Sequence, residues 1–142
     1  MLESGTGIRT AGIATGAAVL ALALLAPLRI AIGQDEISAA EAAAKAGADT
    51  AEGKKFGEAL GQAFGREHGS TIQRCARETK RPDLADFDLF VRVNGSGVVD
   101  QALVAPSTTL ATCVRDKMPG WKIAVPPQGG FWVKVGVTLK SK

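Results

Sequence analysis

An uncharged apolar run, Ala11–Leu28, divides this chain of 142 residues into an N-terminal segment and a folding segment. A helix that is apolar on every side must be covered by protein or lipid, and so short a chain cannot supply enough protein. Arg9 precedes the run and the small-x-small exit Ala31–Gly33 follows it, an arrangement typical of a secretory signal peptide. We therefore predict that residues 1–33 form a signal peptide, with cleavage before Gln34.

An uncleaved inner-membrane anchor is the main alternative for the same segment. The run 11–28 is about 18 residues long, the threshold for a membrane span, and Glu3 weakens the basic start that a signal peptide needs. A buried core helix is a third interpretation. In both leading interpretations residues 34–142 lie in the periplasm, and the protein meets the membrane only through residues 11–28 if these are retained.

The two cysteines, Cys75 and Cys113, are the only ones in the chain. In an oxidising compartment an even number of cysteines indicates a disulfide, and two cysteines allow one pairing. A reactive thiol is the alternative, but neither a CxxC motif nor a neighbouring base is visible. A structural zinc site needs four ligands, which two cysteines and one histidine do not provide. We predict a structural disulfide, no metal and no cofactor.

The charge balance argues against a nucleic-acid partner. The chain has 17 basic and 14 acidic residues. Removing residues 1–33 takes away Arg9, Arg29 and Glu3, which leaves 15 basic and 13 acidic residues. Nucleic-acid binding needs Lys and Arg clustered on one face, and no tract of five occurs here.

Two stretches follow the apolar segment, a spacer at 34–52 and a domain at 53–142. The spacer is rich in alanine and charge, with almost no large apolar residue, so we expect a solvated helix or a flexible linker that buries no face. Residues 53–66 predict a helix, because Phe56, Leu60 and Phe64 recur every fourth residue. A second helix is expected to start at Ser70, a favourable N-cap.

The rest of the domain alternates with the period of a strand. Residues 87–93 and 98–104 predict a β-hairpin around a glycine-containing turn, and 131–139 predicts the clearest strand. Between them, Ser107 or Thr108 is expected to cap a short helix that ends near Pro119. The predicted fold class is α+β, a small antiparallel sheet with helices packed on one face.

The elements of residues 75–139 also resemble a known family. The features that carry the resemblance, in chain order, are Val91 and Val93, Gly95 and Gly97, Val99 and Val104, Ser107-Thr108, Trp121, Pro126-Pro127, and Val133, Val135 and Val137. This order resembles the C-terminal domain of TonB-type energy transducers. The cysteines match better with a relative, the AgmX/PglI-type C-terminal domain, which has one cysteine before the first strand and one in the helix.

The resemblance covers about half of the chain and has two departures. Residues 11–28 contain no histidine of the kind that couples the TonB transmembrane helix to its motor, and residues 34–52 contain no proline, unlike the long Pro-rich TonB spacer. The resemblance therefore implies the fold and an adaptor-like role, without energy transduction.

No arrangement of residues predicts catalysis. His68, the only histidine, is expected to be an exposed residue at a helix exit, and Ser70 and Asp83 do not form a triad on any spacing. No pair of carboxylates belongs to a recognised motif. We therefore predict that the protein is not an enzyme.

The remaining hypothesis is protein binding. Strand 131–139 would offer an unpaired edge to an extended peptide of an envelope or outer-membrane protein. The candidate contacts are Trp132, Lys134, Val135 and Thr138. Outward lysines would favour an acidic peptide, and Trp132 would either stack on it or cover a helix-free side of the sheet. The alternatives are a structural envelope component without an exchangeable ligand and a thiol-dependent redox protein.

Overall fold

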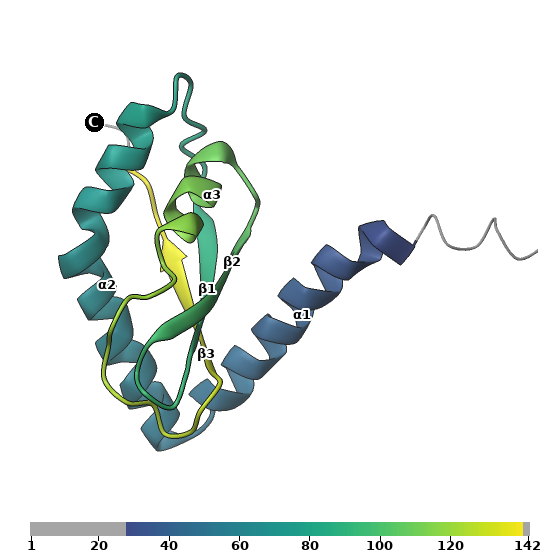
Figure 1. Ribbon diagram of the computed structural model, residues 1–142, viewed down its shortest axis with the longest axis vertical. Coiled ribbons are helices and arrows are strands. Elements are labelled where there is room, and N and C mark those ends of the chain that lie inside the picture. The colour runs from purple at the N-terminus through teal and green to yellow at the C-terminus, as the bar shows by residue number, and fades with distance from the viewer. Residues whose placement is uncertain (1–27, 141–142) are drawn as a thin grey trace, which may run out of the picture.

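The computed structural model describes residues 28–140, which form three helices and one three-stranded antiparallel sheet (Figure 1). The predicted α+β class is confirmed at this level. The elements are α1 (Leu28–Ala48), α2 (Ala51–Glu78), β1 (Phe87–Val93), β2 (Val99–Ala105), α3 (Thr109–Asp116) and β3 (Phe131–Val137).

The predicted signal or anchor segment, residues 1–33, lies almost entirely outside the described residues. Within 28–140, no helix combines the length and the apolar character needed to cross a bilayer. The cleavage site and the anchor alternative therefore stay predictions.

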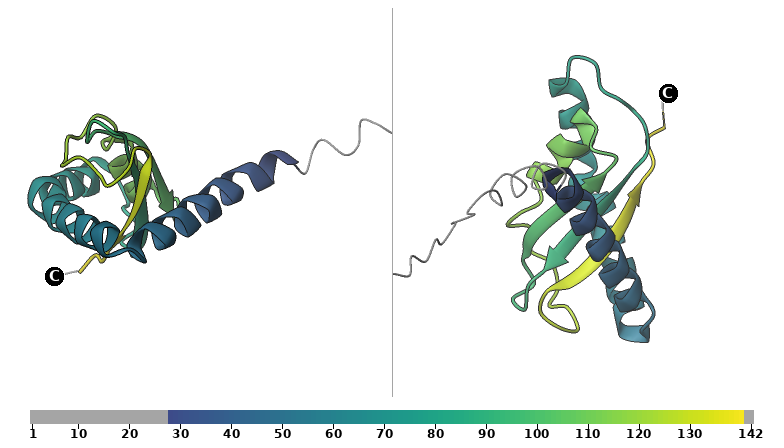
Figure 2. Two further views of the ribbon diagram at one scale, coloured as in Figure 1. Left: turned by 90° about the horizontal axis from the view of Figure 1, so that it is seen from below. Right: turned by 90° about the vertical axis from the view of Figure 1, so that its right-hand side faces the viewer.

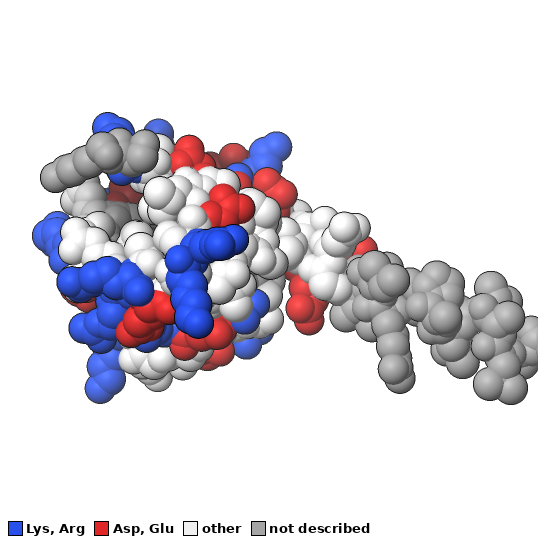
Figure 3. Space-filling view, turned by 90° about the horizontal axis from the view of Figure 1, so that it is seen from above, with Lys and Arg blue, Asp and Glu red and all other residues white. Residues whose placement is uncertain are grey.

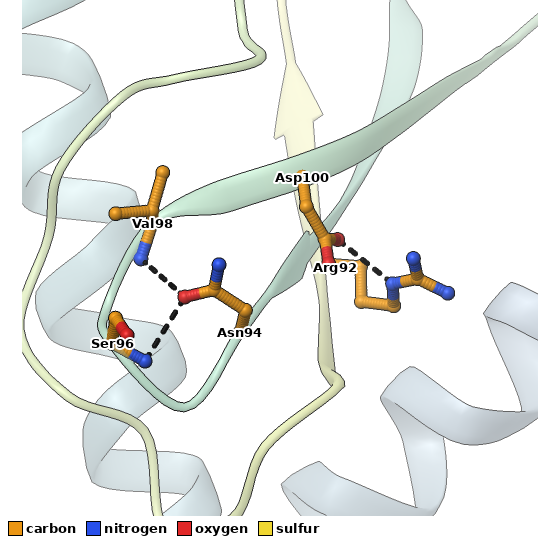
Figure 4. A network of polar contacts seen from close by, with 5 residues as sticks. All are labelled: Arg92, Asn94, Ser96, Val98 and Asp100. Carbon is orange, nitrogen blue, oxygen red and sulfur yellow. Dashed lines mark hydrogen bonds and ion pairs between the residues drawn. The ribbon is translucent and has the colours of Figure 1, made fainter.

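Strand β1 lies at the centre of the sheet, whose order is β2-β1-β3. The β1–β2 hairpin is closed by Asn94, whose Oδ1 accepts hydrogen bonds from the backbone of Ser96 at 3.0 Å and of Val98 at 3.1 Å (Figure 4). Gly97 has φ +79°, and a Cβ there would lie 2.7 Å from the carbonyl oxygen of Ile123. Only glycine satisfies both conditions, which explains the predicted turn.

The main core lies between the sheet and the helices α2 and α3. Its strand residues are those predicted from the alternation, including Leu89, Val91 and Val133. Leu60 and Phe64 of α2 pack against them, as the helical spacing predicts. The Cys75–Cys113 disulfide joins α2 to α3, with the two Cα atoms 5.8 Å apart, and confirms the predicted pairing.

Helix α2 corrects the prediction of two separate helices. It runs without a break from Ala51 to Glu78, and Ser70 is an exposed residue inside it instead of a cap. The N-cap is Thr50, whose hydroxyl accepts from the backbone of Gly53. Each internal glycine costs the helix about 1 kcal/mol. Burial of one face against the sheet offsets that cost, and the sequence alone does not show this packing.

Helix α1 corrects the prediction that residues 34–52 bury no face. Ala40 and Ala44 are buried, and α1 lies across the side of the sheet opposite α2 and α3 (Figure 2). Phe90 points to this side together with its cross-strand partners Leu103 and Lys134, and it is 1% exposed. The prediction that the helices pack on one face of the sheet is therefore wrong, and they pack on both faces. Alanines let a helix approach closely enough to cover large residues on a strand.

Candidate functional site

The candidate site is a groove beside β3, which is an edge strand. Helices α1 and α2, joined by Asp49–Thr50, pass on opposite sides of the first half of β3. Between them lies a groove of about 500 Å³. Its walls are Glu41, Ala44, Lys45 and Ala48 of α1 and Gly53, Lys54, Gly57 and Glu58 of α2, and its floor is Phe131–Lys134 of β3.

Glycines allow the two helices to close around the strand. A Cβ on Gly53 would collide with the backbone oxygen of Gly47, so the helices touch at this crossing. A Cβ on Gly47 would lie 2.7 Å from the Phe131 ring. The groove therefore ends at the crossing, beside the start of β3, and opens toward Lys134.

Lys134 links α1 to the sheet through two ion pairs. Its Nζ lies 3.3 Å from Oδ2 of Asp88 on β1 and 3.5 Å from Oε1 of Glu41 on α1. The hydrogen bond with Asp88, more than the one with Glu41, raises the pKa of the Lys134 ammonium. All three groups are well exposed, so each pair contributes at most about 1 kcal/mol. Because two carboxylates already neutralise it, Lys134 gives little basis for attracting an acidic peptide.

Trp132 is half-buried on the side of the sheet that α1 crosses. The guanidinium of Arg92 lies 5.9 Å from the centroid of the Trp132 ring. Arg92 Nε also donates a hydrogen bond to Oδ1 of Asp100 at 2.8 Å (Figure 4). The interpretation that Trp132 covers a helix-free side is therefore wrong, since α1 covers part of that side. Trp132 lines the groove with one part of its surface.

The four predicted contact residues are not brought together. Trp132 and Lys134 line the groove. The side chain of Val135 points into the core and is 9% exposed, so it is not available to a partner at the edge. Thr138 lies beyond the end of β3, in a separate shallow depression beside Gly136.

Sequence reasoning missed the helical walls of the groove. Ala44 and Ala48 on α1, and Gly53 and Gly57 on α2, are the small residues that flank β3. Their signal is the four-residue spacing of small residues, which places each pair on one face of its helix. That signal is weak, because small residues are also common on exposed helical faces.

His68 lies in a second cluster, away from the groove, and corrects the prediction of an exposed residue at a helix exit. It sits inside α2, with its ring 5.6 Å from Phe64 and 4.5 Å from Trp121. Its Nδ1 lies 3.2 Å from the hydroxyl of Thr71, while Nε2 is buried without a hydrogen-bond partner among residues 28–140. Burial lowers the pKa of His68, and the carboxylate of Glu67 opposes that shift in part.

We expect acid to destabilise the protein through His68. Because the pKa of His68 is lower in the folded state than in the unfolded chain, the unfolded chain binds a proton at a higher pH than the folded protein does. Its stabilising contribution is therefore full above about pH 6.5 and is lost as the pH falls below that value. The free energy of unfolding, measured with urea at pH 8 and at pH 5, should fall less between these two pH values for His68→Gln than for the wild type. Equal differences in the two proteins would contradict this assignment.

The disulfide uses both cysteines of the chain, so neither is a free thiol. The thiol-dependent hypothesis would first require the bond to be opened. Within residues 28–140, no three His, Cys, Asp or Glu side chains are grouped closely enough to hold a metal ion. On the face that Figure 3 shows, acidic side chains lie among the basic ones.

No family model, curated protein or solved structure matches the chain. The resemblance to the TonB and AgmX/PglI-type domains therefore stays a prediction.

Proposed function

We propose that this protein is an exported, non-catalytic interaction domain of the periplasm that binds an extended segment of an envelope protein along the free edge of β3. The observation that carries the proposal is an unpaired strand edge at the floor of a groove. Such an edge presents backbone N–H and C=O groups that an added strand can pair with.

The two edges of the sheet differ, which favours β3 over β2. The start of β2 is closed by the segment after α3: Val99 donates to the oxygen of Trp121 at 2.9 Å, and Gly120 donates to the oxygen of Val99 at 2.8 Å. Within residues 28–140, the ladder of β3 pairs only with β1. Of the two edges, the edge of β3 is the one that lies beside the groove.

The proposed location rests on two independent features. A disulfide between Cys75 and Cys113 suits an oxidising compartment such as the periplasm, and persists poorly in the cytosol. The apolar run 11–28 is the feature expected of a segment that directs export or anchors the chain. Both features support a domain that works outside the cytoplasm.

Proline substitutions on β3 test the edge mechanism. Neighbouring residues of a strand direct their N–H groups to opposite sides. Of Lys134→Pro and Val135→Pro, one should therefore disrupt pairing with β1, while the other removes a donor from the free edge. We expect the variant that keeps its circular dichroism spectrum to bind a partner captured from periplasmic extract at least about tenfold more weakly, through a lost hydrogen bond and a clash.

Lys134→Ala is the matched control, because it removes the side chain and keeps the backbone donor. It should retain partner binding within about threefold. If the folded proline variant binds as tightly as wild type, the edge mechanism is wrong, and a structural role without an exchangeable ligand becomes the better hypothesis.

A further inference from the structure

We infer that the groove takes the C-terminal end of its partner, an extended segment with small side chains that runs antiparallel to β3 and places its free carboxylate between Lys45 and Lys54. This inference rests on the proposed function, and names the class of segment that the β3 edge accepts. Three observations carry it: the closed end of the groove, the arrangement of charges along its rims, and the size of its walls.

The groove is closed at one end. Because α1 and α2 touch where Gly47 meets Gly53, a strand that enters beside Lys134 cannot continue past the crossing. A chain that ends inside the groove fits this shape, whereas an internal segment would have to turn away. The four floor residues Phe131–Lys134 allow pairing over about 13 Å, at about 3.3 Å per residue.

The charges on the rims are ordered along the groove. Lys45 on α1 and Lys54 on α2 are the charged lining residues nearest the crossing, and Glu41 and Glu58 lie about one helical turn farther out. Neither lysine forms an ion pair within residues 28–140, while Glu41 is engaged by Lys134. Two cations at the closed end complement a carboxylate there, whereas at the outer end the two glutamates outnumber the one lysine, Lys134.

The strand direction that this carboxylate position requires is compatible with the antiparallel sheet. A carboxylate at the crossing means that the segment runs from the side of Lys134 toward the side of Phe131. This direction is opposite to β3, so the added strand would extend an all-antiparallel sheet.

The walls limit the side chains of the segment. Residues of a strand alternate between two faces, so successive side chains would point toward α1 and toward α2. The α1 wall offers Ala44 and Ala48, and the α2 wall offers Gly53 and Gly57. A Cβ on Gly57 would lie 3.7 Å from Cγ1 of Val133, which shows how closely α2 approaches the floor. Gly, Ala and Ser are the residues that such walls admit.

The test uses a library of fluorescent heptapeptides of random sequence, made with either a free C-terminal carboxylate or an amide. The oxidised full chain should select peptides with small residues at their last positions. Amidation of a selected peptide should weaken binding at least tenfold. In Lys45→Gln/Lys54→Gln the two forms should bind about equally, whereas the control Lys55→Gln, beside the groove lining, should keep the difference.

A second pair of variants tests the size limit without damage to the fold. Gly57→Ala places a methyl group at an ordinary contact distance and favours the helix, so the protein should remain folded while peptide affinity falls about tenfold. Gly61→Ala is the matched control, since its Cβ meets nothing within 4 Å and lies outside the groove lining.

The outcomes separate this inference from the proposed function. If selected peptides bind equally as acid and amide, and the folded proline variant of β3 still abolishes binding, the C-terminal inference is wrong and edge pairing stands. If no peptide of either form binds, or if binding survives the proline, both proposals fail.

Discussion

Replacing Phe90 by alanine is expected to lower the free energy of unfolding by about 3–5 kcal/mol, the usual cost of removing a buried phenylalanine. Phe90 is 1% exposed, although it points away from the main core. It lies on the side of the sheet that α1 crosses, and among residues 33–48 of α1 the buried side chains are the alanines Ala40 and Ala44. The variant would leave a cavity between β1 and α1 that small residues cannot fill. Urea unfolding followed by circular dichroism measures the change.

Leu103→Ala provides the comparison for Phe90. Leu103 is the partner of Phe90 on β2 and shares its side of the sheet, but it remains half-exposed. Its truncation should therefore cost clearly less than that of Phe90. If the two variants lose similar stability, α1 does not cover Phe90 in solution, and one wall of the proposed groove would be lost with it.

Reduction of the disulfide is expected to cost about 3–4 kcal/mol of stability. Cys75 and Cys113 are separated by 38 residues in sequence, and closing a loop of that length restricts the unfolded chain by roughly this amount. The folded state should keep its secondary structure, because α2 and α3 also pack on the sheet through Leu60 and Leu110. Urea titrations of the oxidised and reduced protein measure the difference.

The double variant Cys75→Ala/Cys113→Ala distinguishes the effect of losing the disulfide from any other effect of the reductant. Its unfolding midpoint should not respond to reductant, and it should lie near that of the reduced wild type. Two reactive thiols in native protein that has never been reduced would show that the bond does not form, and would restore the thiol-dependent hypothesis.

The parts of the fold that follow from the sequence depend on local chemistry. The β1–β2 hairpin is predicted by an alternating strand that is followed by a turn sequence containing Asn94 and Gly97. Both residues take part in the turn as expected. Thr108 caps α3 by accepting a hydrogen bond from Ala111, again through neighbours in sequence. The pairing of the cysteines follows from their number. In each case the residues that decide the structure lie close together in the chain or have only one partner.

The parts that could not be predicted depend on contacts between distant segments. Ala40 and Ala44 are buried because α1 packs on the sheet, whose strands lie more than forty residues later in the chain. His68 is half-buried because Trp121 folds back onto α2, where its Nε1 donates to Glu67 at 2.6 Å. The groove is hardest to predict, because its walls consist mainly of small residues. Small residues form no hydrophobic pattern in the sequence that would indicate a binding site.

The disulfide also bears on the order in which the chain folds. The loop between Cys75 and Cys113 contains β1, β2 and the first half of α3, but not β3. Oxidation can therefore take place before the C-terminal strand has arrived, while β1 still has one open side. β3 must then close a long-range pairing with β1, the slower kind of contact to form. Because β3 is the floor of the groove, a chain in which the disulfide has formed before β3 pairs with β1 would be covalently closed and still lack that floor.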